Sequence, residues 1–170
     1  WSVISNQSLP QMSVFCVDLL AKLDQLQLDY EAALADYSFN TAAQLLYDFF
    51  WGNYCDRFLE AAKTDLNAGD EAAKSATLSV MDAVYGRYLQ LLHPYMPHVT
   101  EELWSTMGYA REGMFLTQTP LASEPLLAGA DTALVADARA QAAAVYETAG
   151  RIRNLKAACG LASKRDLNFI

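Results

Sequence analysis

The stretch HPYMPHVTEELW, residues 93–104, gathers more residues capable of chemistry than any other part of the chain. It holds both histidines and the adjacent pair Glu101 and Glu102. Imidazoles beside carboxylates suggest a metal site or an acid–base pair. A helical pair of histidine ligands needs a spacing of four residues, whereas His93 and His98 are five apart with two prolines between them. The spacing therefore does not predict a metal site.

The same residues have a structural interpretation. Pro94 disfavours helical geometry at His93 and predicts that a helix ends there. Pro97 suits the first position of the next helix, where its missing N–H costs nothing. The two glutamates, on the first turn of that helix, would complement the positive end of its dipole. We interpret the stretch as a corner between two helices, and an enzyme built on His93 and His98 is the weakest hypothesis for the chain.

No other pattern assigns a catalytic residue. The sequence has no glycine-rich phosphate loop and no recognisable nucleophile turn. Its three cysteines, Cys16, Cys55 and Cys159, are widely spaced and odd in number, so they indicate neither a disulfide framework nor a zinc site. We expect no catalytic residue, no metal and no cofactor within this chain.

The charge balance is acidic, with a net charge of −8 and a pI near 4.6. This excludes a broad basic surface, so nucleic acid could bind only at a local patch. Five of the twelve Lys and Arg residues lie within fifteen positions: Arg151, Arg153, Lys156, Lys164 and Arg165. They are either ordinary charges at the end of a helix or contacts to a phosphate backbone, and the residues alone leave both readings open.

The sequence predicts that these residues are positioned by helices. Hydrophobic residues make up 53% and recur at steps of three and four, which is typical of amphipathic helices. Gly52, inside the second helix, lowers its expected regularity. The expected helices begin at Met12, at a cap on Ser38 or Asn40, near Asp70 and Glu71, at Pro97 and at a cap on Asp131. Asp70 and Glu71 are expected to favour the positive end of the third helix dipole. The second helix is expected to reach Lys63, the third Leu92, the fourth about Met107, and the last to end before Gly160.

The predicted fold class is therefore all-α, an antiparallel bundle of four or five helices. A long irregular loop follows Gly108, with one extended piece at residues 114–117. Residues 167–170, LNFI, resemble the start of a strand, and both ends of the sequence look cut. No run of about 18 apolar residues predicts a membrane span.

Three segments carry a family resemblance when they are taken in order: FNTAAQLLYDFFWGNYCDRFLEAAK (39–63), LLHPYMPHVTEELW (91–104) and RIRNLKAACGLASKRDLNFI (151–170). In this order they resemble the anticodon-binding region of class I valyl-tRNA synthetases. The Trp followed by Cys-Asp in the first segment is the specific part, whereas the histidine–proline corner is shared with isoleucyl and leucyl relatives.

The resemblance implies a helical bundle over residues 1–160 and, over 161–170, the start of a following α/β segment. It implies that the partner is the anticodon arm of a tRNA, that of valine, and that neither DNA nor a membrane is bound. ATP and Mg would belong only to the catalytic domain of a longer, cytoplasmic ligase. The residues expected to contact tRNA are Arg57, Lys63, Trp51, Tyr54, Arg151, Arg153 and Lys156.

A second hypothesis comes from a different class. The acidic charge and the departures from the family pattern at Asn53, Arg57 and Phe58 favour a diverged helical module that binds proteins and has lost tRNA.

Overall fold

The computed structural model describes residues 12–110 and 113–161, and every regular element in these ranges is helical. The predicted all-α class is confirmed. The elements are α1 (Val14–Ala35), α2 (Phe39–Asp48), η2 (Phe49–Phe58), α3 (Leu59–Asn67), α4 (Glu71–Leu92), α5 (Pro97–Thr106), η3 (Leu116–Gln118) and α6 (Thr132–Ala158). None of the described helices is both long and apolar enough to cross a membrane.

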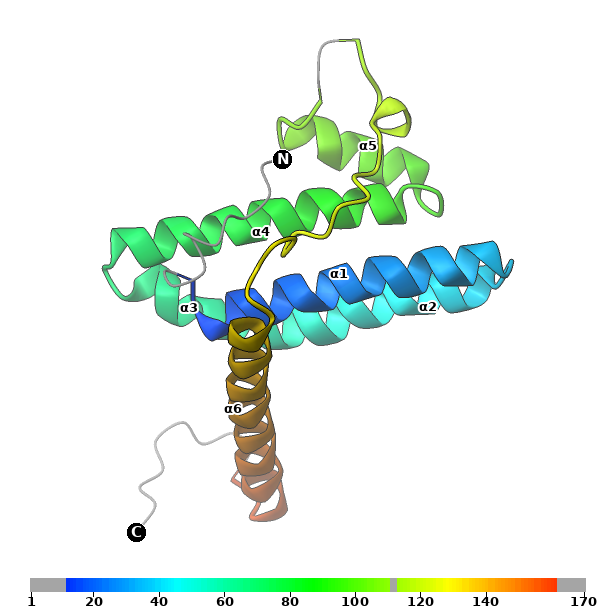
Figure 1. The fold of residues 1–170 in the computed structure, drawn as a ribbon. Helices are drawn as coiled ribbons and strands as arrows, with labels where there is room; N and C mark the ends of the chain where they lie inside the picture. Colours follow the sequence, from blue (N-terminus) through cyan, green and yellow to red (C-terminus); the bar gives the residue numbers. More distant parts are fainter. Residues whose placement is uncertain (1–11, 111–112, 162–170) are drawn as a thin grey trace.

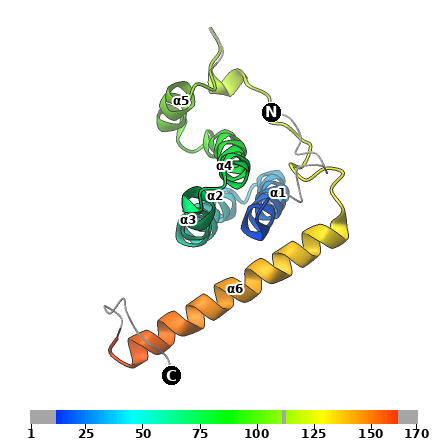
Figure 2. The same ribbon diagram turned by 90° about the vertical axis from the view of Figure 1, so that its left-hand side faces the viewer.

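The helices from α1 to α5 form the bundle. α1 lies beside the continuous run α2–η2–α3, which returns in the opposite direction, and α4 packs against both (Figure 1). α5 turns back over the end of α4. The last helix behaves differently, because α6 crosses α1 at a steep angle and extends past the bundle (Figures 1 and 2).

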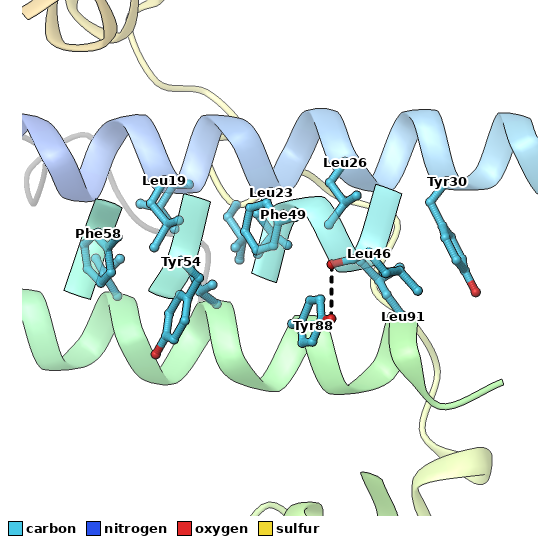
Figure 3. Packing of buried hydrophobic residues seen from close by; sticks show 14 of the residues in the cluster. Leu19, Leu23, Leu26, Tyr30, Leu46, Phe49, Tyr54, Phe58, Tyr88 and Leu91 are labelled. Carbon is cyan, nitrogen blue, oxygen red and sulfur yellow. Dashed lines mark hydrogen bonds between the residues drawn. The ribbon is translucent and has the colours of Figure 1, made fainter. Parts of the chain in front are cut away.

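The core is built on one face of α1. Leu19, Leu23, Leu26 and Tyr30 follow the spacing of three and four that lines one side of a helix, and all are buried. Figure 3 shows them along one edge of the core, opposite side chains from η2 and α4. The buried partners are Leu46 on α2, Phe49, Tyr54 and Phe58 on η2, and Tyr88 and Leu91 on α4.

Carboxylates begin two of the helices, whereas Ser38, expected as a cap, makes no side-chain hydrogen bond at the start of α2. The Asp70 carboxylate accepts the backbone N–H groups of Ala72 and Ala73, at 2.9 and 3.3 Å, and so begins α4. The Asp131 carboxylate accepts the N–H of Ala133 at 2.8 Å at the start of α6. After α6, Gly160 takes a φ of +68°, a conformation that glycine adopts without steric cost.

The second helix is irregular around Gly52, as expected, and the irregularity is a π-helical stretch over η2. The rings of Phe50 and Tyr54 stack with centroids 5.7 Å apart, and those of Tyr54 and Phe58 lie 5.8 Å apart. These aromatic contacts give η2 a packed inner face.

The long loop before α6 is anchored to the bundle by the buried guanidinium of Arg87 on α4. The guanidinium donates to the side-chain oxygen of Gln27 on α1 and to the carbonyls of Ala122 and Glu124 in the loop. Asp24 of α1 accepts the next two loop amides, those of Leu126 and Leu127, at 2.7 and 3.0 Å. The loop therefore reaches α6 along a path that is held at several points.

Within the extended piece predicted at residues 114–117, Phe115 is extended (φ −88°, ψ 159°), but from Leu116 the prediction is wrong. The chain forms the short 3-10 helix η3, and its Leu116 N–H donates to both oxygens of Glu101 at 2.9 and 3.0 Å. The Gln118 side chain accepts the N–H of Phe115 in addition. Side chains thus satisfy the amides that a strand would offer to a partner. The strand predicted at residues 167–170 lies outside the described residues, as does the division at 161–170 apart from Leu161.

Replacing Leu23 by Ala is expected to destabilise the fold by about 2–5 kcal/mol, because the side chain is fully buried and its loss leaves a cavity. Leu28, on the same helix, is 59% exposed and is the matched control. Urea unfolding followed by circular dichroism measures both. Equal losses for Leu23→Ala and Leu28→Ala would contradict the assigned face of α1.

Two buried tyrosines should respond differently to removal of their hydroxyl groups. The Tyr88 hydroxyl donates to the carbonyl of Leu46 at 3.2 Å, whereas the Tyr30 hydroxyl has no hydrogen-bond partner among the described residues. Tyr88→Phe should therefore cost about 0.5–1.5 kcal/mol, and Tyr30→Phe should be neutral or stabilising. Thermal unfolding of both variants checks this, and a larger loss at Tyr30 than at Tyr88 would refute it.

Candidate functional site

The histidine–proline corner is structural. α4 ends at Leu92 and α5 begins at Pro97, as predicted, although His93 itself keeps helical geometry (φ −52°, ψ −40°), so the expected effect of Pro94 on His93 is wrong. The Thr100 hydroxyl donates to the carbonyl of Met96 at 2.8 Å and lies 2.7 Å from Nδ1 of His93, while His98 is exposed. Within the described residues, no group of three or more His, Cys, Asp or Glu side chains is placed to hold a metal.

The two glutamates of this corner have a different role from the one predicted. Neither lies in the first turn of α5. Glu101 instead binds the amide of Leu116 and fixes the start of the loop, so its carboxylate satisfies a backbone group at a distance in sequence. The prediction that the pair complements the helix dipole is therefore wrong, although the structural reading of the corner is right.

Of the aromatic residues considered for base stacking, Trp51 alone is exposed. Its side chain is 53% exposed, whereas Tyr54 is 8% exposed and Phe58 is buried. Tyr54 lies between Phe50 and Phe58, so its ring offers no free face to a base. Trp51 is the member of this set that a nucleotide could reach.

Trp51 borders an apolar cleft of about 520 Å³ formed by α2, η2, α4 and α5. Two tyrosines of the cleft use their hydroxyl groups internally, since Tyr88 donates to Leu46 and Tyr95 donates to Phe39. No lysine or arginine lines it. The cleft therefore suits apolar contact better than recognition of a base edge or a phosphate.

Arg57 and Lys63 have unlike surroundings. The Lys63 ammonium pairs with Glu60 one turn away, at 2.6 Å, and both side chains are exposed. This is the solvated ion pair expected on the polar face of a helix, and it is worth little. The guanidinium of Arg57 lies over the ring of Tyr146 on α6, 5.8 Å from its centroid. Arg57 thus faces α6, whereas Trp51 borders the cleft shared with α4 and α5, and the structure does not bring the two together.

α6 carries the predicted basic residues on a largely uncovered helix. Ala142 is its one buried residue among those described. The apolar positions at heptad-like spacing, Leu134, Val145, Ile152 and Leu155, are exposed, because α6 packs on α1 through a different face. Arg151 and Arg153 are exposed, and neither forms an ion pair with another described residue. Lys156 is half-buried and already interacts with another part of the protein. Lys164 and Arg165 lie outside the described residues.

The sequence reasoning missed Tyr146. It contacts Phe15, Lys22 and Arg57, which come from two other elements. Its spacing from Ala142, one helical turn, was the available signal, since these two residues mark the packed face of α6.

Comparison with known proteins gives a consistent result. A family model described as the anticodon-binding domain of tRNA ligase matches residues 18–170. The valine–tRNA ligase of Chromobacterium violaceum is 34% identical over 163 residues, which are 92% of this chain and 16% of that protein. The valine–tRNA ligase of Rhizobium meliloti is 39% identical over 118 residues, 65% of this chain and 12% of that protein. The chain thus spans roughly one-sixth or less of the length of these relatives.

Proposed function

The chain belongs to the family of anticodon-binding domains of tRNA ligases, and we propose that it holds the anticodon arm of valine tRNA for a longer ligase. The parent reaction would be the ATP-dependent attachment of valine to tRNA. ATP and Mg would bind in a catalytic domain elsewhere in the polypeptide. Residues 161–170 would begin the next, α/β segment.

The observation that carries the proposal is the basic end of α6. Arg151 and Arg153 are exposed on a helix that extends past an otherwise acidic molecule. Guanidinium groups suit phosphate oxygens because their planar N–H groups donate in pairs. Phosphate contacts of this kind supply affinity and position the RNA, while unpaired loop bases are read by stacking and edge hydrogen bonds.

The protein-binding module is the less supported alternative. The apolar cleft beside Trp51 is the feature that favours it. The match to anticodon-binding domains over residues 18–170 favours tRNA instead.

Removing the charges of Arg151 and Arg153 together, by substitution with Gln, should weaken binding of the full chain to a valine tRNA transcript. The slope of log K against log salt should become shallower by about 1–2, because up to two phosphate contacts are lost. Filter binding across a salt series measures both quantities. Lys74→Glu, at a partly exposed position in the first turn of α4, changes the net charge by the same amount and should leave the slope nearly unchanged. Equal effects of the two variants would overturn the assignment.

Trp51 is proposed to stack on an unpaired base of the anticodon loop, on the side of η2 away from α6. Trp51→Ala should then lower affinity for the same transcript about tenfold, and Trp51→Phe should retain most of it because a ring remains. The measurement is made at one fixed salt concentration. Unchanged binding by Trp51→Ala would remove this residue from the site and leave the role of the α6 cations intact.

A further inference from the structure

Resting on the proposed function, we infer that tRNA phosphates bind in the angle between η2 and the projecting end of α6, and that Tyr146 is the positioning residue that holds Arg57 toward them. Arg57 and Arg153 are the cations that flank this angle.

Tyr146 joins three elements. Its ring lies 5.4 Å from the ring of Phe15 on α1, centroid to centroid. The ammonium of Lys22, also on α1, lies over the same ring at 5.5 Å, and the guanidinium of Arg57 on η2 lies over it at 5.8 Å. Desolvation by this packing raises the pKa of Tyr146 to about 12, so the phenol is neutral at physiological pH. A neutral aromatic ring attracts cations through its face and limits their movement.

Of the cations near Tyr146, Lys22 has a carboxylate partner and Arg57 has none among the described residues. Asp18 accepts a hydrogen bond from Lys22 at 2.6 Å and lies 4.0 Å from Arg139. Arg57 forms no ion pair within the described part of the chain. An arginine that rests on an aromatic face keeps the N–H groups in its own plane free to donate. Arg57 is therefore oriented by Tyr146 while it remains able to bind an anion.

Arg153 lies on the same face of α6 as Tyr146. It follows by seven residues, which is two turns, or about 10 Å along the axis. Over this distance α6 leaves the bundle, as Figure 2 shows by its divergence from α3. Arg153 is exposed there, and its helical position places it on the face of α6 from which Tyr146 meets Arg57. Arg151, five residues after Tyr146, is rotated by about 140° from that face.

The geometry therefore distinguishes two neighbouring arginines of equal charge. One phosphate path can run from Arg57 to Arg153 along the inner side of the angle, whereas Arg151 lies around the helix from it. Arg151 and Arg153 lie on one helix, are both exposed and carry the same guanidinium group. They form a matched pair, because replacing either one by Gln changes the net charge by the same amount and the two variants differ only in the face of α6 that is altered.

The experiment uses the full chain and a valine tRNA transcript in filter binding. Arg153→Gln should weaken binding about tenfold and lower the salt slope by about 1, and Arg151→Gln should have a clearly smaller effect. Tyr146→Leu should weaken binding several-fold in the parent chain but have no further effect when Arg57 is already Gln. Tyr146→Phe should bind like the parent, because the ring is retained.

Equal effects of Arg151→Gln and Arg153→Gln would overturn the assigned face. Tyr146→Leu effects that are the same with and without Arg57 would show a structural role only and overturn the positioning role. A readout without RNA completes the test: the Nε–Hε group of Arg57 should gain fast motion by NMR relaxation in Tyr146→Leu and not in Tyr146→Phe. Loss of tRNA binding in every form, with Arg57 still ordered by Tyr146, would refute the proposed function and leave the contact itself in place.

Discussion

The placement of the last helix depends on the buried guanidinium of Arg87. Taking a charge out of water is expensive unless hydrogen bonds replace its hydration. Arg87 recovers them from Gln27 on α1 and from loop carbonyls, and this draws the loop across α1 and α4. Burial lowers the pKa of Arg87, while Asp24 and Glu31 oppose that shift. The loop then has one path, and α6 starts from a defined point.

Local chemistry explains which parts of the fold were predictable. Asp70, Asp131 and the prolines of the corner act on backbone groups within one turn of their own positions, so the helix ends could be read from neighbouring residues. The start of the loop was not readable in this way. Its conformation depends on Glu101, which reaches an amide fifteen residues further on. A contact of that kind needs the packed helices before it can form.

The candidate site likewise has features that the sequence predicts and features that depend on tertiary packing. The exposed Arg151 and Arg153 follow from a charge cluster that is visible in the sequence. The burial of Tyr54 does not, because the π-helical stretch turns it into the core beside Phe50. The packed face of α6 was also hidden, since small and aromatic residues make the contact while larger aliphatic residues remain outside. The periodicity of apolar residues identifies a helix and its apolar face, but it does not identify which face packs against the rest of the protein.

α6 is packed against the bundle at one end only, so a small rotation at its contacts displaces its far end by a larger distance. Its firm contacts end near Tyr146, and about 18 Å of helix continues to Ala158 without a buried side chain. A tilt of 5° at the crossing would move the far end by about 1.6 Å, from the length of the arm alone. Small adjustments where Tyr146 meets α1 and η2 are thus enlarged at Arg153. The rigidity of the packing around Tyr146, and not the number of cations on α6, therefore sets how precisely Arg153 is positioned.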